Sequence, residues 1–399
     1  MKIFKLMAIA LVAMLGFSSC SEDCDHEFIE VDYSKDLVGT WTCLTADYAE
    51  ALVIKADGSV VSTGVENGEY WDGVKGSIKT TNNKMTLLFE DNDNYEGRFE
   101  MICGEAFTIF DENGKHLTYR YCANDLADEI VGMWIATTGP YMSVEVFNED
   151  GSAIYTGFVP ESEEMAVTSV TSYKVVGDLQ FHTVAEDNST YVVHRLIYSP
   201  SSQTSLGEIM TWQVDENISF PRLRVKQSLD LAGKKYDYIK TFVSNVKGLD
   251  KDINFMGFEF NFAKMDGVKL DKMLKTLLFA VEFPTADSIK YSCHYNGEYM
   301  ALTAPIAVDG NKMTVKMSDK DAAYKDIDLY TFQDADCSQM HMYMPTYAFI
   351  NFFGNMQATM MSQMGQLDLT NAEAVKAVFD SIDEAVETIN VSFVMTRAK

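Results

Sequence analysis

The chain has 399 residues, a formal net charge of −27 and a hydrophobic fraction of 47%, which is enough to build packed cores. A charge of this size and sign repels phosphate backbones, so we expect no nucleic-acid partner.

The first residues have the pattern of a targeting signal rather than that of a folded segment. Two lysines precede an apolar run over 6–17, and Ser18 and Ser19 stand directly before Cys20. The run is too short to span a bilayer as a permanent helix. The pattern resembles the signal peptide of a bacterial lipoprotein, which implies that residues 1–19 are removed and that Cys20 is acylated.

Residues 20–35 follow as an acidic tether with no core pattern. Its first part, over 21–25, resembles the surface-export signal of Bacteroidetes lipoproteins. This implies a lipid-anchored protein of the outer membrane that faces the cell exterior, held to the membrane lipid through the acyl chains on Cys20. The inner face of the same membrane stays open as an alternative.

The chain then repeats itself at an offset of 93 residues. The segment from Asp36 to Trp41 recurs from Glu129 to Trp134. The same offset, without a gap, places the Asp-Gly-Ser of 57–59 on that of 150–152. Chance rarely keeps an aromatic residue and a turn in register over this distance, so we expect a duplicated domain, with units at 36–125 and 126–228.

A third, degenerate unit is expected over 229–399. Its opening repeats at 230–233, and Tyr236 stands where a tryptophan is expected. The tetrapeptides of 67–70 and 83–86 reappear at 296–299 and 311–314 in the same order. The intervals predict insertions before 296 and again before the last strand.

Within the units the residue pattern is that of strands. Segments such as 84–90, 106–110 and 117–121 alternate or run apolar and are rich in Val, Ile, Thr, Tyr and Phe. Asp-Gly and Asn-Gly pairs between them favour tight antiparallel turns. A unit of this length therefore predicts an antiparallel sandwich or small barrel.

A Gly-x-Trp on the first strand, with an arginine late in the last strand, is similar to the pattern of the lipocalin or calycin family. The motif consists of Gly39 and Trp41 in the first unit and of Gly132 and Trp134 in the second. The resemblance implies that the arginine packs across the tryptophan and closes the barrel floor. The candidate closing residues of the three units are Arg120, either Arg222 or Arg224, and Arg397.

Bacteroidetes lipoproteins often carry such units in tandem. The chain is therefore expected to be all-β, with three tandem lipocalin-like antiparallel barrels or sandwiches. The alternative left open is that the Gly-x-Trp tryptophan is a core aromatic of another sandwich.

Near the carboxyl end the pattern changes from β to α. Apolar residues recur at helical spacing over Pro345–Met364 and again over Thr370–Ile389, where Thr370 and Glu373 predict a capping box. A strand follows at 391–395. This predicts a helical hairpin inserted before the last strand of the third unit, on the barrel or across its mouth.

Six cysteines remain besides Cys20, an even number that permits three disulfides in an oxidising compartment. Cys293 and Cys337 both lie in the last third of the chain, and we expect them to form a disulfide. No CxxC pair has metal-ligand spacing, so no metal site or cofactor is expected.

No catalytic motif is present. The histidines show no HExxH spacing, and there is no Gly-x-Ser-x-Gly elbow or phosphate-binding glycine loop. Weaker alternatives are a calcium loop at 91–97, a copper site at 340–344 and an acidic contact loop at 161–164. For each of these a structural role is the simpler interpretation.

Two tryptophans, Trp71 and Trp212, lie outside the Gly-x-Trp motif and are candidate ligand contacts, because aromatic rings stack on sugars and fill protein hot spots. We expect a binding protein without catalytic activity, which takes a small apolar or glycan ligand at a barrel mouth or on its loops. The alternative is a structural or interaction module that docks another outer-membrane or extracellular protein.

Overall fold

The computed structural model describes residues 32–398 apart from a set of short gaps and one longer gap. Cys20 and the residues before it therefore lie outside the described residues, as do parts of the suggested calcium and acidic loops. The gaps are 91–93, 111–115, 137–142, 160–163, 185–188, 204–206, 215–216, 251, 256–257, 265–279, 296–297 and 318–322.

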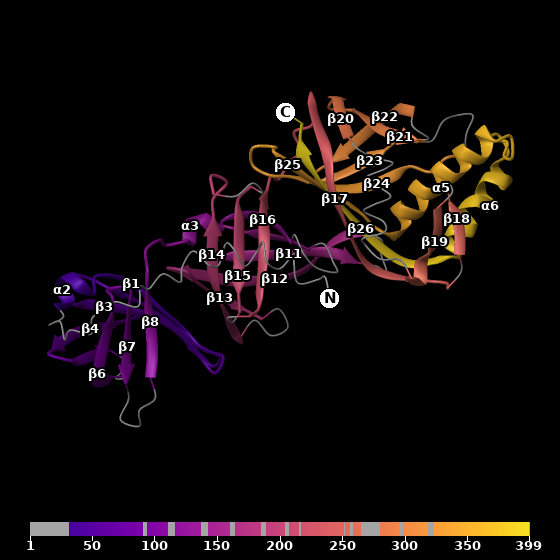
Figure 1. The fold of residues 1–399 in the computed structure, drawn as a ribbon. Coiled ribbons are helices and arrows are strands. Elements are labelled where there is room, and N and C mark those ends of the chain that lie inside the picture. The colour runs from indigo at the N-terminus through magenta and orange to yellow at the C-terminus, as the bar shows by residue number, and fades with distance from the viewer. Residues whose placement is uncertain are drawn as a thin grey trace. The chain divides into compact units, whose positions relative to one another are not determined.

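The described strands form three closed antiparallel barrels of eight strands each, joined in the order of the chain (Figure 1). This confirms the prediction of an all-β chain with three tandem barrels. The first barrel follows strand order without a crossover, from β1 to β8. In each barrel all neighbouring strands pair, so no barrel leaves an open edge along its sheet.

The chain also divides into two compact units, which do not coincide with the three barrels. The first unit comprises Met1–Glu129, Ser172–Leu196 and Gln213–Ile218, and the second comprises Ile130–Thr171, Ile197–Trp212 and Ser219–Lys399. Within the first unit, Leu179 and Phe181 pack in one apolar cluster with Ala49, Ala51 and Val65. The outer faces of β2 and β3 are therefore buried as well as their inner faces.

The first barrel begins after the one-turn helix α2. Its inner face is apolar at alternating positions, as a half-buried strand requires, and the interior is filled by residues such as Leu52, Phe99 and Phe107. The elements are α2 (Tyr33–Asp36), β1 (Gly39–Leu44), β2 (Tyr48–Ile54), β3 (Ser59–Glu66), β4 (Glu69–Thr81), β5 (Lys84–Phe89), β6 (Tyr95–Ile102), β7 (Ala106–Phe110) and β8 (His116–Cys122).

The second barrel repeats the first with its own one-turn helix, α3. Its elements are α3 (Ala127–Ile130), β9 (Gly132–Ala136), β10 (Ser143–Phe147), β11 (Ser152–Val159), β12 (Glu164–Val176), β13 (Leu179–Thr183), β14 (Tyr191–Ser199), β15 (Ile209–Gln213) and β16 (Ser219–Val225).

The strand register shows that the two barrels are copies at the offset of 93 residues. Gly39 pairs with Ile54 in the first barrel, and Gly132 pairs with Phe147 in the second. The two Asp-Gly-Ser turns also match, since in both the serine amide donates to the first residue's carboxylate at 2.9 Å. Both turn glycines have a φ of +81°.

A buried indole closes the base of each of these barrels. Trp41 Nε1 donates to the carbonyl of Leu37 at 2.8 Å, and Trp134 Nε1 donates to that of Ile130 at 2.7 Å. In each case the acceptor lies four residues earlier, at or just after the one-turn helix. The helix therefore supplies the hydrogen-bond partner that a buried indole needs.

The residue that packs across the indole differs between the two barrels. Arg224 lies in register with Trp134 and places its guanidinium carbon 4.5 Å from the ring centroid. In the first barrel Tyr121 is in register with Trp41, with ring centroids 5.2 Å apart. Arg120 pairs with Thr42 instead, so its prediction as the closing residue is wrong by one position. A shift of one residue along a strand moves a side chain to the other face of the sheet.

The third barrel lacks a tryptophan but is closed as well. Tyr236, which is fully buried, takes the position of the indole and pairs with Arg397 across the seam of the barrel. The strands of this barrel are β17 (Lys234–Gly248), β20 (Ala280–Thr285), β21 (Ser288–Tyr295), β22 (Glu298–Asp309), β23 (Lys312–Val315), β24 (Ile327–Gln333), β25 (Gln339–Met344) and β26 (Val386–Arg397).

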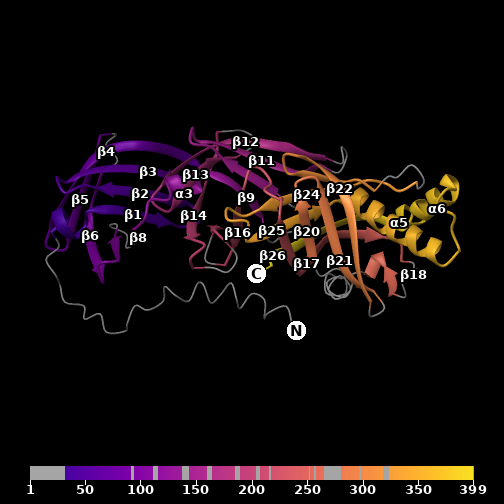
Figure 2. The ribbon, with the colours of Figure 1, turned by 90° about the horizontal axis from the view of Figure 1, so that it is seen from above.

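Two insertions distinguish the third barrel, as the intervals predict. The first, between β17 and β20, contains the hairpin β18 (Asp252–Phe255) and β19 (Phe258–Asn261) and the 3-10 helix η2 (Phe262–Lys264). The second, between β25 and β26, contains α5 (Thr346–Gln363) and α6 (Ala372–Asp383), which lie side by side (Figures 1 and 2).

The helical hairpin is shorter than its sequence pattern predicts. Helix α6 is capped by Asn371, whose side chain accepts from the amide of Ala374, so the predicted capping box of Thr370 and Glu373 is wrong. The second helix ends at Asp383, and Ile389 already belongs to β26. Apolar residues on the two elements merge into one periodic run because both pack on the same core.

Helix α5 fills the end of the third barrel that lies opposite Tyr236. Phe349 and Phe353 belong to the same core cluster as Met340 and Met342 of β25. Thr346 ties the helix start to β26 through two hydrogen bonds of 3.0 Å with the backbone of Ile389. Side chains of the hairpin therefore pack into the core at this end of the third barrel.

The expected disulfide between Cys293 and Cys337 is also wrong, because Cys337 is a free, buried thiol. Cys293 lies on β21, whereas Cys337 lies in the turn between β24 and β25. Strands β21 and β24 are three steps apart in the barrel, or about 14 Å along the sheet, against a limit of about 7 Å between the Cα atoms of a disulfide. Cys103 is disulfide-bonded, and Cys43 and Cys122 are free.

A substitution at Gly39 tests how much the close packing at the base of the first barrel contributes to stability. Its φ is +134°, and a Cβ atom there would lie 2.6 Å from Cε2 of Tyr121. We expect Gly39→Ala to lower the free energy of unfolding by about 2 kcal/mol or more, from backbone strain and overpacking. Urea unfolding followed by tryptophan fluorescence measures this loss.

The control is Gly132→Ala, at the equivalent position of the second barrel, where φ is +136° and the nearest atom to a Cβ would be Nη1 of Arg224 at 3.0 Å. This variant carries the same backbone strain with a less severe contact and should lose less stability than Gly39→Ala. Equal losses in the two variants would show that the contact with Tyr121 does not matter.

Candidate functional site

Polar and aromatic side chains gather inside the first barrel, at the end opposite Trp41. They come from β2, β3, β4 and β8, and we call them the Glu50 cluster. Its members are Tyr48, Glu50, Ser62, Trp71 and Tyr119.

The register of the strands explains why these residues meet. Leu52 and Ile54 of β2 lie in the barrel core, so Glu50, two residues before Leu52, also points inward. Glu50 pairs with Gly64, and Gly64 pairs with Trp71. Paired residues on neighbouring strands face the same side of a sheet, so this row crosses the inner face of three strands.

Three hydroxyl groups donate hydrogen bonds to the carboxylate of Glu50, which is 5% exposed. Tyr48 donates to Oε2 at 2.7 Å, and Ser62 and Tyr119 donate as well. Trp71 Nε1 in turn donates to Ser62 Oγ at 2.8 Å. Hydrogen bonds of this kind stabilise the ionised form of a buried carboxylate.

The same environment keeps the neighbouring acids protonated. Burial, and then the charge of Glu50, raise the pKa of Tyr48 and of Tyr119 well above the usual range. Burial and the same carboxylate raise the pKa of the Cys43 thiol to about 12. The phenols therefore remain hydrogen-bond donors, and the thiol is a poor nucleophile at neutral pH.

A β-bulge directs Trp71 into the cluster. The pairing of β3 with β4 shifts between Ser62 and Gly64, next to Gly73 with its φ of +64°. The indole then lies over Gly64, where a Cβ atom would be 2.2 Å from Cζ2 of Trp71. Only glycine at this position leaves room for the ring.

Two rings of the cluster are half-buried rather than buried. The centroids of Tyr48 and Trp71 lie 6.0 Å apart, with their planes inclined by 44°. Trp71 is therefore placed at the end of a barrel with part of its surface exposed, as a ligand contact must be.

The second barrel does not repeat this cluster. At the offset of 93 residues Ser143 replaces Glu50, and the residue that faces Gly157, the counterpart of Gly64, is Thr168 rather than a tryptophan. Its buried carboxylate is Glu145, which pairs with a cation: Arg222 reaches Oε1 through Nε at 3.0 Å and through its terminal nitrogen at 2.9 Å. The two copies have therefore diverged inside their barrels while keeping the same base.

Trp212, the other candidate ligand contact, is a core residue. It is 4% exposed and stacks on Phe147 at 5.7 Å, with its ring edge toward Trp134 at 5.9 Å. Arg222 lies 5.6 Å from its centroid. The side chain has no free face for a ligand at the surface, and its prediction as a contact is corrected accordingly.

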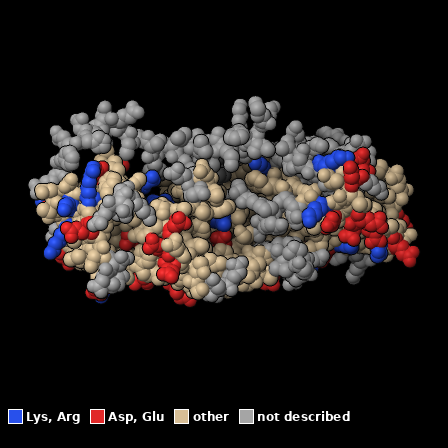
Figure 3. Space-filling view, turned by 90° about the horizontal axis from the view of Figure 1, so that it is seen from below, with Lys and Arg blue, Asp and Glu red and all other residues tan. Residues whose placement is uncertain are grey.

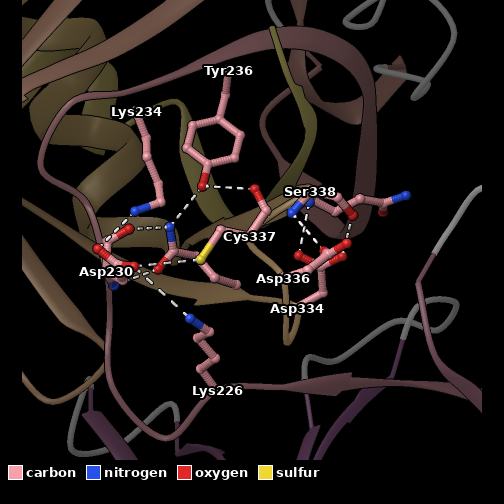
Figure 4. Close-up of polar contacts among 10 residues, drawn as sticks. Lys226, Asp230, Lys234, Tyr236, Asp334, Asp336, Cys337 and Ser338 are labelled. Atoms are coloured by element: carbon pink, nitrogen blue, oxygen red, sulfur yellow. Dashed lines mark hydrogen bonds and ion pairs between the residues drawn. The ribbon is translucent and has the colours of Figure 1, made fainter. Parts of the chain in front are cut away.

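At the base of the third barrel a polar network takes the place of the indole hydrogen bond (Figure 4). Tyr236 Oη donates to the carbonyl of Cys337 at 3.2 Å, and Gln333 Nε2 donates to Tyr236 Oη at 2.8 Å. Gln333 also bonds the backbone of Asp230, whose carboxylate pairs with Lys234 at 2.7 Å. Each buried group of this polar network has a partner within the fold, so we assign the network a structural role.

The methionine-rich strand β25 provides core packing rather than a copper site. Met340, Met342 and Met344 face the core of the third barrel, whereas His341 lies on the opposite face of the strand. A metal ion on one side of the sheet cannot bind both the methionine sulfur atoms and the imidazole of His341. In the part of the chain that the structure describes, no group of three His, Cys, Asp or Glu side chains could hold a metal ion.

Sequence reasoning identified Trp71 but missed Glu50 and its hydroxyl partners. A signal was present, because Tyr48, Glu50, Leu52 and Ile54 alternate on one face of a strand. A charged residue at an inward position of such a series indicates a buried, hydrogen-bonded carboxylate.

No known family profile matches the chain, and no curated protein matches it. Solved structures do match the chain, and two of them are of transferrin binding protein B. One is a double mutant of the vaccine antigen from Haemophilus parasuis Hp5, with 10% identity and a TM-score of 0.26. The other is the isotype 1 protein from serogroup B Neisseria meningitidis, with 9% identity and a TM-score of 0.21.

Each match covers 88% of this chain but only 66% of the other protein. These TM-scores are too low to assign the chain to a family or to carry a function across. Within the described residues, no helix has the length and apolarity needed to cross a membrane.

His341 gives a pH dependence that the structure predicts. Burial lowers the pKa of this imidazole to about 4 from the ordinary value of 6.5. Between these values the unfolded chain binds the proton and the folded chain does not, so stability falls as the pH falls from 6.5 to 4. We expect His341→Gln to remove about 3 kcal/mol of that loss at pH 4.

The measurement is urea unfolding of the parent and the variant at pH 7, 5.5 and 4, and the two free energies of unfolding are compared at each pH. His116→Gln, at an exposed position, is the control and should follow the parent. A His341→Gln variant with the parent's pH dependence would contradict the assignment.

Proposed function

We propose that the chain is a non-catalytic, lipid-anchored binding protein of the cell envelope that captures a small organic ligand at the Glu50 cluster. The observation that carries this proposal is the placement of Trp71, which a bulge and Gly64 hold half-exposed over a hydrogen-bonded carboxylate. Bulges of this kind re-aim side chains next to binding sites.

The absence of an activated nucleophile in the cluster supports a binding role over catalysis. Cys43 is held as a thiol, and the hydroxyls of Ser62 and Tyr119 donate to Glu50. A carboxylate that accepts three hydrogen bonds is a weak base. The cluster is therefore suited to recognition by shape, charge and hydrogen bonds.

Location in the envelope rests on the sequence before Ser21. The lysine-flanked apolar run, the small residues and Cys20 support a lipoprotein of the outer membrane. On the face shown in Figure 3, acidic and basic side chains lie side by side, with acidic ones gathered toward the right. A surface of this kind favours anchoring by acyl chains rather than by a basic protein face.

A second candidate function is docking of another envelope or extracellular protein. It is favoured by the packing of the barrel interiors, since residues such as Phe107, Phe147 and Phe283 are fully buried there. A barrel of eight strands has an interior that its own side chains fill. In that case the barrels would bind through their outer surfaces.

Ligand capture is tested by thermal unfolding of the full chain carrying Cys20→Ser, titrated with apolar probes, neutral glycan fragments and organic amines. We expect at least one class to raise the melting temperature saturably, equivalent to about 2.7 kcal/mol at one hundred times Kd. Trp71→Leu should abolish the rise.

The matched control is Phe220→Leu, which removes an aromatic ring that is 44% exposed in the second barrel. It should leave the rise unchanged. If no probe stabilises the parent while an envelope protein co-purifies with it stoichiometrically, the docking function replaces the proposal.

The anchor is tested separately, in cells fed radiolabelled palmitate. The parent chain should incorporate label and sediment with the outer membrane, and Cys20→Ser should do neither, because the acyl chains provide the membrane affinity. Cys24→Ser is the control and should keep the label. Labelling of Cys20→Ser would contradict the proposed lipid site.

A further inference from the structure

One turn of the first barrel carries a cysteine that already has a covalent partner. Cys103 is exposed and disulfide-bonded. Among the described residues the free thiols are Cys43, Cys122 and Cys337. Of the seven cysteines in the chain, three therefore remain as partners: Cys20, Cys24 and Cys293. The geometry of the first barrel and the chemistry of the anchor distinguish between these three.

Cys103 stands at the tip of the tight turn between β6 and β7. The amide of Glu105 donates to the carbonyl of Ile102 at 3.0 Å. The two residues between them, Cys103 and Gly104, both have positive φ angles, of +50° and +70°. Asparagine is the residue that such turns favour, and Asn67 occupies the first place in the turn between β3 and β4, with a φ of +52°. The turn itself therefore does not require a cysteine.

The turn lies at the base of the first barrel, where the chain enters it. The amide of Tyr121 donates to the carbonyl of Glu105 at 2.7 Å, and the ring of Tyr121 packs on Trp41. Strands β7, β8 and β1 are neighbours, so two strand spacings, about 10 Å, separate the turn from the start of β1. Helix α2, which leads into β1, therefore brings the preceding chain to the end of the barrel that carries Cys103.

This entry point favours Cys24 as the partner. Cys24 precedes Tyr33, the first residue of α2, by nine residues, and an extended chain of that length spans at most about 30 Å. This reach exceeds the distance from the start of β1 to the turn. The tether can therefore bring Cys24 to Cys103 without any change in the barrel.

The other two cysteines fit less well. Cys20 is the residue that the sequence marks for acylation, and a sulfur atom that carries a lipid has no thiol left for a disulfide. Cys293 pairs with Met300 in the third barrel and belongs to the second compact unit, whereas Cys24 and Cys103 both belong to the first. Elimination and position in the fold therefore select the same residue.

We propose that Cys24 forms a disulfide with Cys103 and so fastens the acidic tether to the base of the first barrel. The bond joins the two Sγ atoms, and each thiol loses one proton and one electron. The protons and electrons pass by thiol–disulfide exchange to the disulfide of an envelope thiol oxidase, which becomes a dithiol.

The bond shortens the anchor. Cys20 is then joined to the barrel through the four residues up to Cys24, which span at most about 14 Å, instead of through the thirteen residues up to Tyr33. The base of the first barrel becomes the end held nearest to the membrane, opposite the Glu50 cluster. This consequence rests on the acylation of Cys20 in the proposed function, whereas the bond itself does not.

Peptide mapping tests the bond without the lipid. The full chain carrying Cys20→Ser is exported to the envelope, alkylated with iodoacetamide in denaturant without reductant, and digested with trypsin. We expect the peptide 99–115, which contains Cys103, to be linked to the peptide that ends at Lys35 and contains Cys24. Reduction should separate the two peptides.

Two variants of the lipid-bearing chain check the assignment. Cys24→Ser should leave a free thiol at Cys103, which iodoacetamide then modifies. Cys293→Ser, the matched control, should leave Cys103 unmodified. A link to the peptide 291–312 would assign the partner to Cys293, and an alkylated Cys103 in the Cys20→Ser chain would assign it to Cys20. Either result overturns the proposal.

A second experiment tests the shortened anchor. The lipid-bearing chain, with a specific protease site inserted between Cys24 and α2, is bound to phosphatidylethanolamine and phosphatidylcholine vesicles, cut and sedimented. We expect the cut chain to stay with the vesicles and to leave them when dithiothreitol is added, because the disulfide still joins the barrel to the lipid-bearing segment. The same chain with Cys24→Ser should leave the vesicles on cutting alone.

The outcomes separate the bond from the proposed anchor. If cutting alone releases the chain that keeps Cys24, the anchored protein lacks the bond and the proposal is overturned. If the uncut chain does not sediment with the vesicles, the acylation of Cys20 is wrong, and the mapped disulfide stands by itself.

Discussion

Each of the first two barrels depends on a single hydrogen bond from a buried indole to a carbonyl four residues earlier. Trp41 and Trp134 can be buried in the barrel base only because Leu37 and Ile130 accept their N–H groups. The acceptor comes from a one-turn helix, so the bond fixes where the first strand starts and how the chain enters it. The inward face of that strand, and by pairing that of every later strand, follows from this start.

Position in the register then decides what each residue does. In the first barrel it places Tyr121 rather than Arg120 across the indole, and it brings Glu50, Gly64 and Trp71 into one row. In the third barrel Tyr236 replaces the indole, and its hydroxyl reaches a different carbonyl, that of Cys337. The base is conserved as a position in the fold, whereas the chemistry that satisfies it varies.

The repeats, the strands and the number of barrels could be predicted because alternation, turn residues and the offset of 93 residues are local or periodic signals. The strand register could not be predicted, because the sequence of β8 does not show whether Arg120 or Tyr121 lies on the same face of the sheet as Trp41. The capping residue Asn371 and the free thiol of Cys337 depend on three-dimensional geometry that residue spacing does not contain. The site was partly predictable, since Trp71 and Trp212 carry the same sequence signal and differ only in what packs around them.

The insertion of two helices between β25 and β26 lengthens the stretch of chain between the two strands that close the third barrel. Strand β26 pairs with β17, so the third barrel closes by pairing Tyr236 with Arg397. In the first barrel the closing pair of Thr40 and Cys122 is much closer in the sequence. Because the chain is synthesised from its amino end, the first barrel can close early, whereas the third barrel cannot close before β26 has emerged. Chaperone dependence and proteolytic sensitivity during folding should therefore concentrate in the third barrel, where the two closing strands are farthest apart in the sequence.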